Sequence, residues 1–209
     1  LKEPTLEGYT FPEPDLERNA RRYDRLVAEH SDCFRHAGVG FSMFERAWTL
    51  RGMENVLADM VLHPSFVDEL MERILEYNLK VIDHLLAWDI DCVRFGDDWG
   101  QQRGLIMGPK HWRRFIKPRV AVMYERVKSA GKYVMQHSCG DVDELFPELI
   151  DMGLDIFNPF QPEVMDVQSI KKESGQHLTF YGGISTQQVL PRVTPDELRC
   201  VMRHMMETI

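Results

Sequence analysis

The feature that most constrains the fold is a regular alternation of short β-rich runs with amphipathic helices. The runs expected to form strands are residues 90–95, 133–136, 155–157 and 178–181, and helices are expected at 109–130, 141–152, 166–173 and from Thr194 onward. Strand–helix repeats of this kind predict βαβ units and a parallel sheet. The chain has no GxGxxG loop, which argues against a dinucleotide-binding open sheet. We therefore predict an α/β fold of the (β/α)8 TIM-barrel type.

The rest of the chain divides into an arm and the start of the barrel. Residues 1–14 are rich in Pro, Glu and Gly and are expected to form an extended arm, followed by a single TIM-barrel domain over 15–209. Helices are expected at 15–29, 44–62 with a break near Gly52, and 65–88, with a short strand at 38–43. The chain starts at Leu1, and the Thr194 helix still runs at Ile209. Because a complete barrel takes about 250 residues, we expect a barrel truncated at its carboxyl terminus.

Composition narrows the classes of partner. The net charge of −8 argues against nucleic acid, which needs a concentrated basic surface. Four scattered cysteines do not resemble a disulfide framework, so we expect a reducing, cytoplasmic location. No apolar run approaches the roughly 18 residues that a membrane span needs, so no membrane partner is expected. The sequence leaves a homodimer open.

A histidine and a cysteine lie two positions apart where the 133–136 strand ends, in the sequence His137-Ser-Cys139-Gly. Side chains at i and i+2 of an extended segment project the same way, so the imidazole and the thiolate can hold one ion. Both are preferred zinc ligands, and a pair without further cysteines nearby favours an open, catalytic site over a closed structural one. The alternative is a chance spacing, with Cys139 acting as a small buried hydrophobe.

Other residues with chemical character also follow predicted strands. Asp98 is the predicted catalytic residue, as a metal ligand, a general acid or base, or an acceptor for substrate. Asp97 is expected to be structural because its side chain points the opposite way. The predicted substrate-binding residues are Trp99, Gln102, Asn158 and Gly183. In a barrel these strand ends converge on one face, where the active site lies.

Together these segments resemble the uroporphyrinogen decarboxylase (URO-D) superfamily of TIM barrels, from about Phe41 to Ile209. The resemblance rests on the motifs at residues 96–102, 106–109, 115–118, 137–141, 153–158 and 180–186. The His-x-Cys-Gly sequence is most similar to the corrinoid-dependent methyltransferase branch. That resemblance implies a zinc ion held by His137, Cys139 and a later ligand, expected beyond Ile209. It also implies methyl transfer between a small donor, or a thiol such as coenzyme M, and the methylcobalamin of a partner corrinoid protein.

Two other functions remain open at this point. One is a cofactor-free decarboxylase of uroporphyrinogen or a related tetrapyrrole, although the Arg-rich amino-terminal motif of true decarboxylases is not visible in this chain. The other is a barrel that binds a corrinoid or its carrier protein without turnover. Metal content and the consumption of a porphyrinogen separate these functions.

Overall fold

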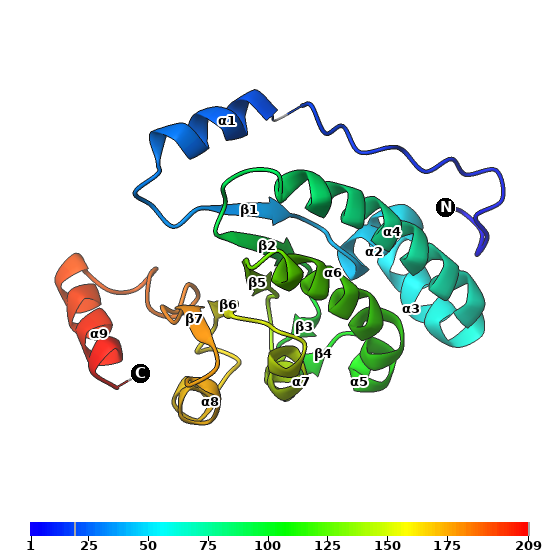
Figure 1. Cartoon of the computed structure of the whole chain (residues 1–209). Helices are drawn as coiled ribbons and strands as arrows, with labels where there is room; N and C mark the ends of the chain where they lie inside the picture. Colours follow the sequence, from blue (N-terminus) through cyan, green and yellow to red (C-terminus); the bar gives the residue numbers. More distant parts are fainter. Residues whose placement is uncertain (19, 209) are drawn as a thin grey trace.

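The computed structural model describes residues 1–18 and 20–208 and contains one five-stranded, fully parallel sheet. The strands are β1 (His36–Val39), β2 (Cys92–Gly96), β5 (Tyr133–His137), β6 (Ile156–Phe160) and β7 (Thr179–Gly182). Their order in the sheet, β1-β2-β5-β6-β7, follows the chain, so each new strand is added to the same side of the sheet (Figure 1). This stepwise order, with helices between the strands, is that of a partial TIM barrel and confirms the predicted fold class.

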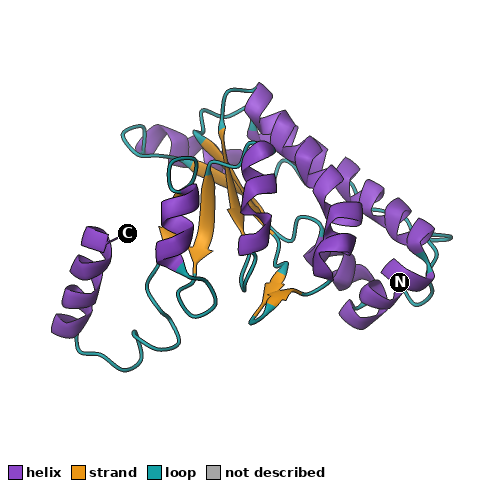
Figure 2. Cartoon of the chain, turned by 90° about the horizontal axis from the view of Figure 1, so that it is seen from below, coloured by secondary structure: helices purple, strands orange, loops and turns teal. Residues whose placement is uncertain are grey.

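The helices between consecutive strands lie on one side of the sheet, and α9 stands away from it (Figures 1 and 2). The helices are α1 (Ala20–Glu29), α2 (Phe44–Arg51), α3 (Met53–Leu62), α4 (Pro64–Leu85), α5 (Gly108–His111), α6 (Lys117–Ser129), α7 (Phe146–Asp151), α8 (Val167–Ser174) and α9 (Pro195–Thr208). Helices α4 and α6 pack against each other. Helix α4 also packs against β1, and α6 packs against β5. Among the described residues, no helix has the length and apolar character needed to cross a membrane.

The two faces of the sheet differ in burial. One face is buried beneath the helices and carries Ala37, Val39, Val93, Phe95, Val134 and Phe157. The other face is half-buried or exposed at most positions and carries His36, Arg94, His137, Asn158, Thr179 and Tyr181. In a TIM barrel the second face is the barrel interior. The polar side chains of the candidate site therefore come from the face that a barrel closes around.

Several element boundaries differ from the sequence-based expectation, and prolines explain two of them. The helix expected at 109–130 is instead α5, a π-helical segment η1 (Trp112–Ile116) and α6. Pro118 has no N–H to donate to the carbonyl of Arg114, and the Arg119 side chain donates to that carbonyl instead. Likewise the helix expected at 141–152 begins as a 3₁₀ turn, η2 (Asp143–Leu145), ahead of Pro147.

Other differences concern short or exposed segments. The first helix begins at Ala20 rather than at Asp15, and residues 1–18 form neither helix nor strand. The first strand covers His36–Val39 rather than 38–43. An antiparallel hairpin of two short strands, β3 (Gly100–Gln101) and β4 (Gly104–Leu105), was not predicted, because two-residue strands show no alternation of polar and apolar residues. This hairpin matters because it lies against the candidate site.

The Asp97 side chain links the end of β2 to the start of α2 through hydrogen bonds. Its carboxylate is fully buried and accepts hydrogen bonds from the backbone N–H groups of Phe44 (3.0 Å) and Glu45 (2.8 Å). It also accepts one from the Trp99 indole at 2.6 Å. Burial is the main cause that raises the pKa of Asp97 to about 6, and these hydrogen bonds oppose the rise. The side chain thus caps a helix within the core, in the structural role expected for it.

Candidate functional site

The site is built by the register of three neighbouring strands. Gly96 of β2 pairs with His137 of β5, and His137 pairs with Asn158 of β6, so these three residues lie at one level of the sheet. Each strand ends at or just beyond this level, and the residues that follow therefore gather at one rim. Asp98 and Cys139 each come two positions after a residue of that level. The predicted catalytic residue, Asp98, therefore lies close to the predicted metal ligands, His137 and Cys139.

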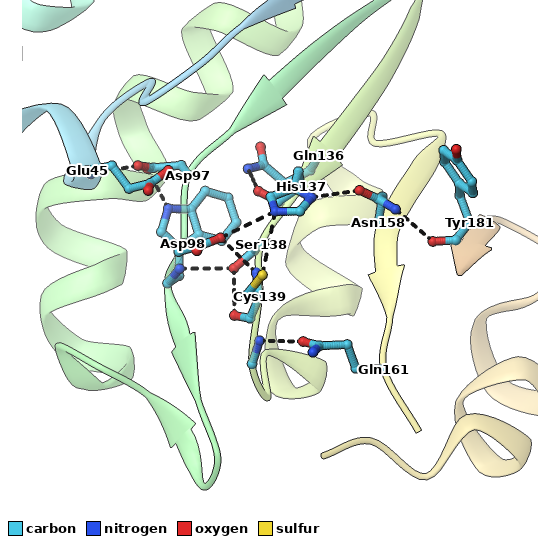
Figure 3. A network of polar contacts seen from close by, with 12 residues as sticks. Glu45, Asp97, Asp98, Gln136, His137, Ser138, Cys139, Asn158, Gln161 and Tyr181 are labelled. Atoms are coloured by element: carbon cyan, nitrogen blue, oxygen red, sulfur yellow. Dashed lines mark hydrogen bonds and ion pairs between the residues drawn. The ribbon is translucent and has the colours of Figure 1, made fainter. Parts of the chain in front are cut away.

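Three side chains converge at this rim: Asp98, His137 and Cys139 (Figure 3). The His137 Nε2 atom lies 3.6 Å from the Asp98 Oδ1 atom and 3.6 Å from the Cys139 Sγ atom. One ligand atom from each residue lies within 4.8 Å of the others, and all three residues are half-buried. An imidazole nitrogen, a carboxylate oxygen and a thiolate sulfur are each donors that protein zinc sites use.

The distances from His137 Nε2 to the other two donor atoms fit a tetrahedral ion. Zinc bonds to nitrogen or oxygen are about 2.0–2.2 Å long and those to sulfur about 2.3 Å, which gives tetrahedral ligand-to-ligand edges of about 3.3–3.6 Å. The two 3.6 Å separations from His137 Nε2 lie at the upper end of this range. Bound thiolate and carboxylate would together supply two negative charges to a divalent cation. The residues present therefore fit a zinc ion with three protein ligands.

The loop that carries Cys139 is held by four consecutive backbone N–H groups, each bonded to a different neighbour. The N–H of Ser138 donates to the carbonyl of Asn158 (2.9 Å), and that of Cys139 to Asp98 Oδ1 (2.8 Å). The N–H of Gly140 donates to Gln161 Oε1 (2.7 Å), and that of Asp141 to the carbonyl of Gln101 (2.7 Å). In addition, the buried Ser138 hydroxyl accepts from the N–H of Trp99 at 2.9 Å. The backbone around the thiol is therefore fixed before any ligand arrives.

Two glycines let the β3–β4 hairpin pack directly on this loop. A side chain at Gly140 would place Cβ 2.3 Å from the backbone carbon of Gly100, and Gly140 also has a φ of +83°. A side chain at Gly100 would place Cβ 2.7 Å from the carbonyl oxygen of Cys139. Both contacts are with backbone, which cannot rotate away. The glycine after the His-x-Cys motif is thus required by the contact with the hairpin.

Burial and neighbouring negative charge raise the pKa values of two groups at the site. Burial first, and the neighbouring carboxylate of Asp98 second, raise the pKa of the Cys139 thiol to about 11. Glu45, a buried residue in the first turn of α2, was not predicted from the sequence. Burial and the charges of Asp98 and Asp97 raise its pKa to about 7. An acidic residue in a first helical turn is common, so the sequence carries no distinct signal for Glu45.

Asn158 lies beside His137 rather than at an open pocket wall. The His137 Nδ1 atom and the Asn158 Oδ1 atom are 2.6 Å apart, and the Asn158 amide nitrogen donates to the carbonyl of Tyr181 at 3.0 Å (Figure 3). This side chain links β5 to β7 across the half-buried face of the sheet. It is the one predicted substrate-binding residue with a direct hydrogen bond to a member of the trio in the described part of the chain.

The other predicted substrate-binding residues are placed differently. Trp99 is fully buried against Trp112, which corrects the expectation that its indole lines a pocket. Its backbone bond to Ser138 and its indole bond to Asp97 turn it into the core. Gln102 is exposed in the turn of the β3–β4 hairpin. Gly183 is buried, donates to the carbonyl of Phe160, and faces the Met205 side chain of α9.

The fold and the site together define a class of protein. It is a parallel α/β partial barrel whose carboxyl rim carries three side chains of the kinds that bind metal ions. The model of the family "Uroporphyrinogen decarboxylase (URO-D)" matches residues 36–209. The chain belongs to this family. None of the curated proteins compared with the chain matches it.

A solved structure, a methyltransferase from Methanosarcina mazei, has the same fold. It superposes with a TM-score of 0.80 at 15% sequence identity, over 99% of this chain and 61% of its own. At that identity the likeness concerns the fold. The chain spans about three-fifths of the length of that structure.

The contact between hairpin and loop gives a testable prediction. Gly140→Ala should lower the free energy of unfolding by more than about 3 kcal/mol, because it combines a positive φ with a backbone clash. Gly104→Ala is the matched control: it has a φ of +99° in the same hairpin with no atom within 4 Å of the added Cβ. It should cost only about 1–2 kcal/mol. Urea unfolding of both variants measures the difference, and equal losses would contradict the account.

Proposed function

We propose that this chain is the metal-binding part of a zinc-dependent methyltransferase of the URO-D family. The proposed reaction moves a methyl group between a small substrate or thiol and a partner corrinoid protein that carries methylcobalamin. The observation that carries the proposal is the convergence of Asp98, His137 and Cys139 at one rim of the partial barrel. The fold of the methyltransferase from Methanosarcina mazei supports it.

The ligand set favours a catalytic rather than a structural ion. Structural zinc sites usually have four protein ligands, whereas catalytic sites have three and keep one position for water or substrate. His137 and Cys139 would be the nitrogen and sulfur ligands, and Asp98 would be the oxygen ligand that the sequence analysis left undecided. When bound, zinc would supply Lewis acidity, which lowers the pKa of a thiol or water at the open position.

The residues of this chain would then orient the reacting thiol. If the thiol is the acceptor, its thiolate sulfur would attack the methyl carbon, so that an S–C bond forms as the Co–C bond breaks and its electron pair stays on the corrinoid. His137, Cys139 and Asp98 are held by short strands and by a loop whose backbone N–H groups are all bonded, so the acceptor would be placed with little loss of entropy. In TIM barrels the active site lies at this rim, so a partner corrinoid protein would have to dock there.

Zinc binding is the first test. The protein should bind about one zinc per chain, and His137→Ala, Cys139→Ala and Asp98→Ala should each weaken zinc affinity at least 100-fold, because each removes one of three ligands. Cys33→Ala is the matched control, since Cys33 is an exposed free cysteine whose loss should leave the affinity unchanged. Competition titration against a chelator measures these affinities. Zinc affinity that is unaffected by all three ligand substitutions would sink the proposal.

Catalysis is the second test. Zinc-loaded protein should demethylate methylcobalamin when a thiol is present, and Cys139→Ala should lose at least 100-fold in rate while Cys33→Ala retains full rate. Absorbance of the corrinoid follows the reaction. A metal-free protein that consumes uroporphyrinogen would instead establish the decarboxylase function. Zinc binding without demethylation for any thiol or methylated donor would favour a corrinoid-binding or carrier-binding barrel.

A further inference from the structure

The Asn158 side chain contacts the His137 ring at Nδ1, the ring nitrogen that does not face Asp98 and Cys139. His137 Nδ1 lies 2.6 Å from Asn158 Oδ1, while the Asn158 amide nitrogen lies 3.0 Å from the carbonyl oxygen of Tyr181 (Figure 3). His137 and Asn158 are paired neighbours in β5 and β6, and Tyr181 is in β7. Three adjacent strands therefore contribute to one chain of hydrogen bonds.

The direction of these hydrogen bonds follows from the chemistry of the last group in the series, the carbonyl of Tyr181. A backbone carbonyl only accepts, so the atom of Asn158 that faces Tyr181 must be the amide nitrogen. The amide oxygen then faces His137, and because that oxygen also only accepts, Nδ1 must carry a hydrogen. A neutral imidazole has one N–H, so Nε2 is left with a free lone pair. The opposite amide orientation would bring two acceptors together at Tyr181.

We propose that Asn158 is a positioning residue that sets the Nδ1–H tautomer of His137 and thereby directs the Nε2 lone pair at the cation site. This inference rests on the proposed function for the identity of the cation, but the tautomer itself is a property of the metal-free chain. Nε2 lies 3.6 Å from both Asp98 Oδ1 and Cys139 Sγ, too far for a hydrogen bond to the carboxylate. In the other tautomer, the Nε2 hydrogen would occupy the position of the ion.

The choice of an amide over a carboxylate is also explained. An aspartate at position 158 would still accept from Nδ1–H, but its second oxygen would face the carbonyl of Tyr181. It would also add a second negative charge next to the His137 ring, whose Nε2 atom already lies near Asp98 Oδ1. Metal-bound histidines commonly donate their other N–H to such a partner, and loss of that partner weakens metal affinity about 10- to 100-fold. Asn158→Leu removes both hydrogen bonds at nearly constant shape, whereas Asn158→Asp keeps the acceptor for Nδ1–H.

The test measures the tautomer directly in metal-free protein. At a pH where His137 is neutral, ¹⁵N chemical shifts should show the Nδ1–H form in the unmodified protein and in Asn158→Asp, and a shift toward Nε2–H in Asn158→Leu. His137→Gln identifies the signal by removing it. Zinc affinity should fall about 10- to 100-fold in Asn158→Leu and remain within a few-fold in Asn158→Asp. Asn55→Ala, which removes an exposed amide bonded to Arg51, is the control and should change neither quantity.

The outcomes separate this inference from the proposed function. An Nε2–H tautomer in the unmodified protein, or one that Asn158→Leu leaves unchanged, overturns the positioning role. A tautomer that shifts as expected in a protein that binds no zinc supports the role of Asn158 toward His137 and contradicts the proposed function. If Asn158→Leu fails to fold, the tautomer of the unmodified protein and of Asn158→Asp still decides the question.

Discussion

The shared register of β2, β5 and β6 is the constraint on which the site depends. Gly96, His137 and Asn158 lie at one level because parallel backbone hydrogen bonds set their pairing. A one-residue slip of β5 would turn His137 toward the helices and bring the buried face of the strand to the rim. The apolar side chains under the helices resist that slip, since Val134 and Phe157 are fully buried. The hydrophobic core therefore determines the position of the polar trio.

Neighbouring residues at the rim divide structural and chemical roles between them. Asp97 is buried and caps α2, while Asp98 faces the site. Likewise Ser138 is buried and bonds to Trp99, while His137 and Cys139 on either side of it face Asp98. This division follows from the two-residue period of extended backbone, which sends adjacent side chains in opposite directions. The structural members fix the backbone that the chemical members need.

Much of this arrangement could be predicted because it depends on local pattern. The strand–helix alternation predicted the parallel sheet, and the opposite directions of Asp97 and Asp98 were predicted from strand geometry. The common direction of His137 and Cys139 followed from the same rule. What the sequence could not show depends on contacts between distant segments. The raised pKa of Glu45 comes from its burial and from the charges of Asp98 and Asp97, and that proximity exists only after α2 has packed on the end of β2.

The contact made by Asn158 was also beyond sequence reasoning, since it depends on pairing between β5, β6 and β7. Trp99 was expected at a pocket wall, but its bonds to Ser138 and Asp97 hold it in the core, where its indole packs against Trp112. Gly183 was expected to approach a ligand, whereas a methionine from α9 lies against it. In each of these cases the residue type indicated that the residue makes a specific contact, but the group that it contacts depends on tertiary packing.

We propose that one imidazole, one thiolate and one carboxylate of this chain hold a zinc ion. X-ray absorption of the zinc-loaded protein measures that ligand set directly. The expected spectrum shows one sulfur at about 2.3 Å and the remaining ligands as nitrogen or oxygen at about 2.0–2.2 Å. The sulfur signal should disappear in Cys139→Ala. A shell without sulfur, or one with two sulfurs in this chain, would contradict it.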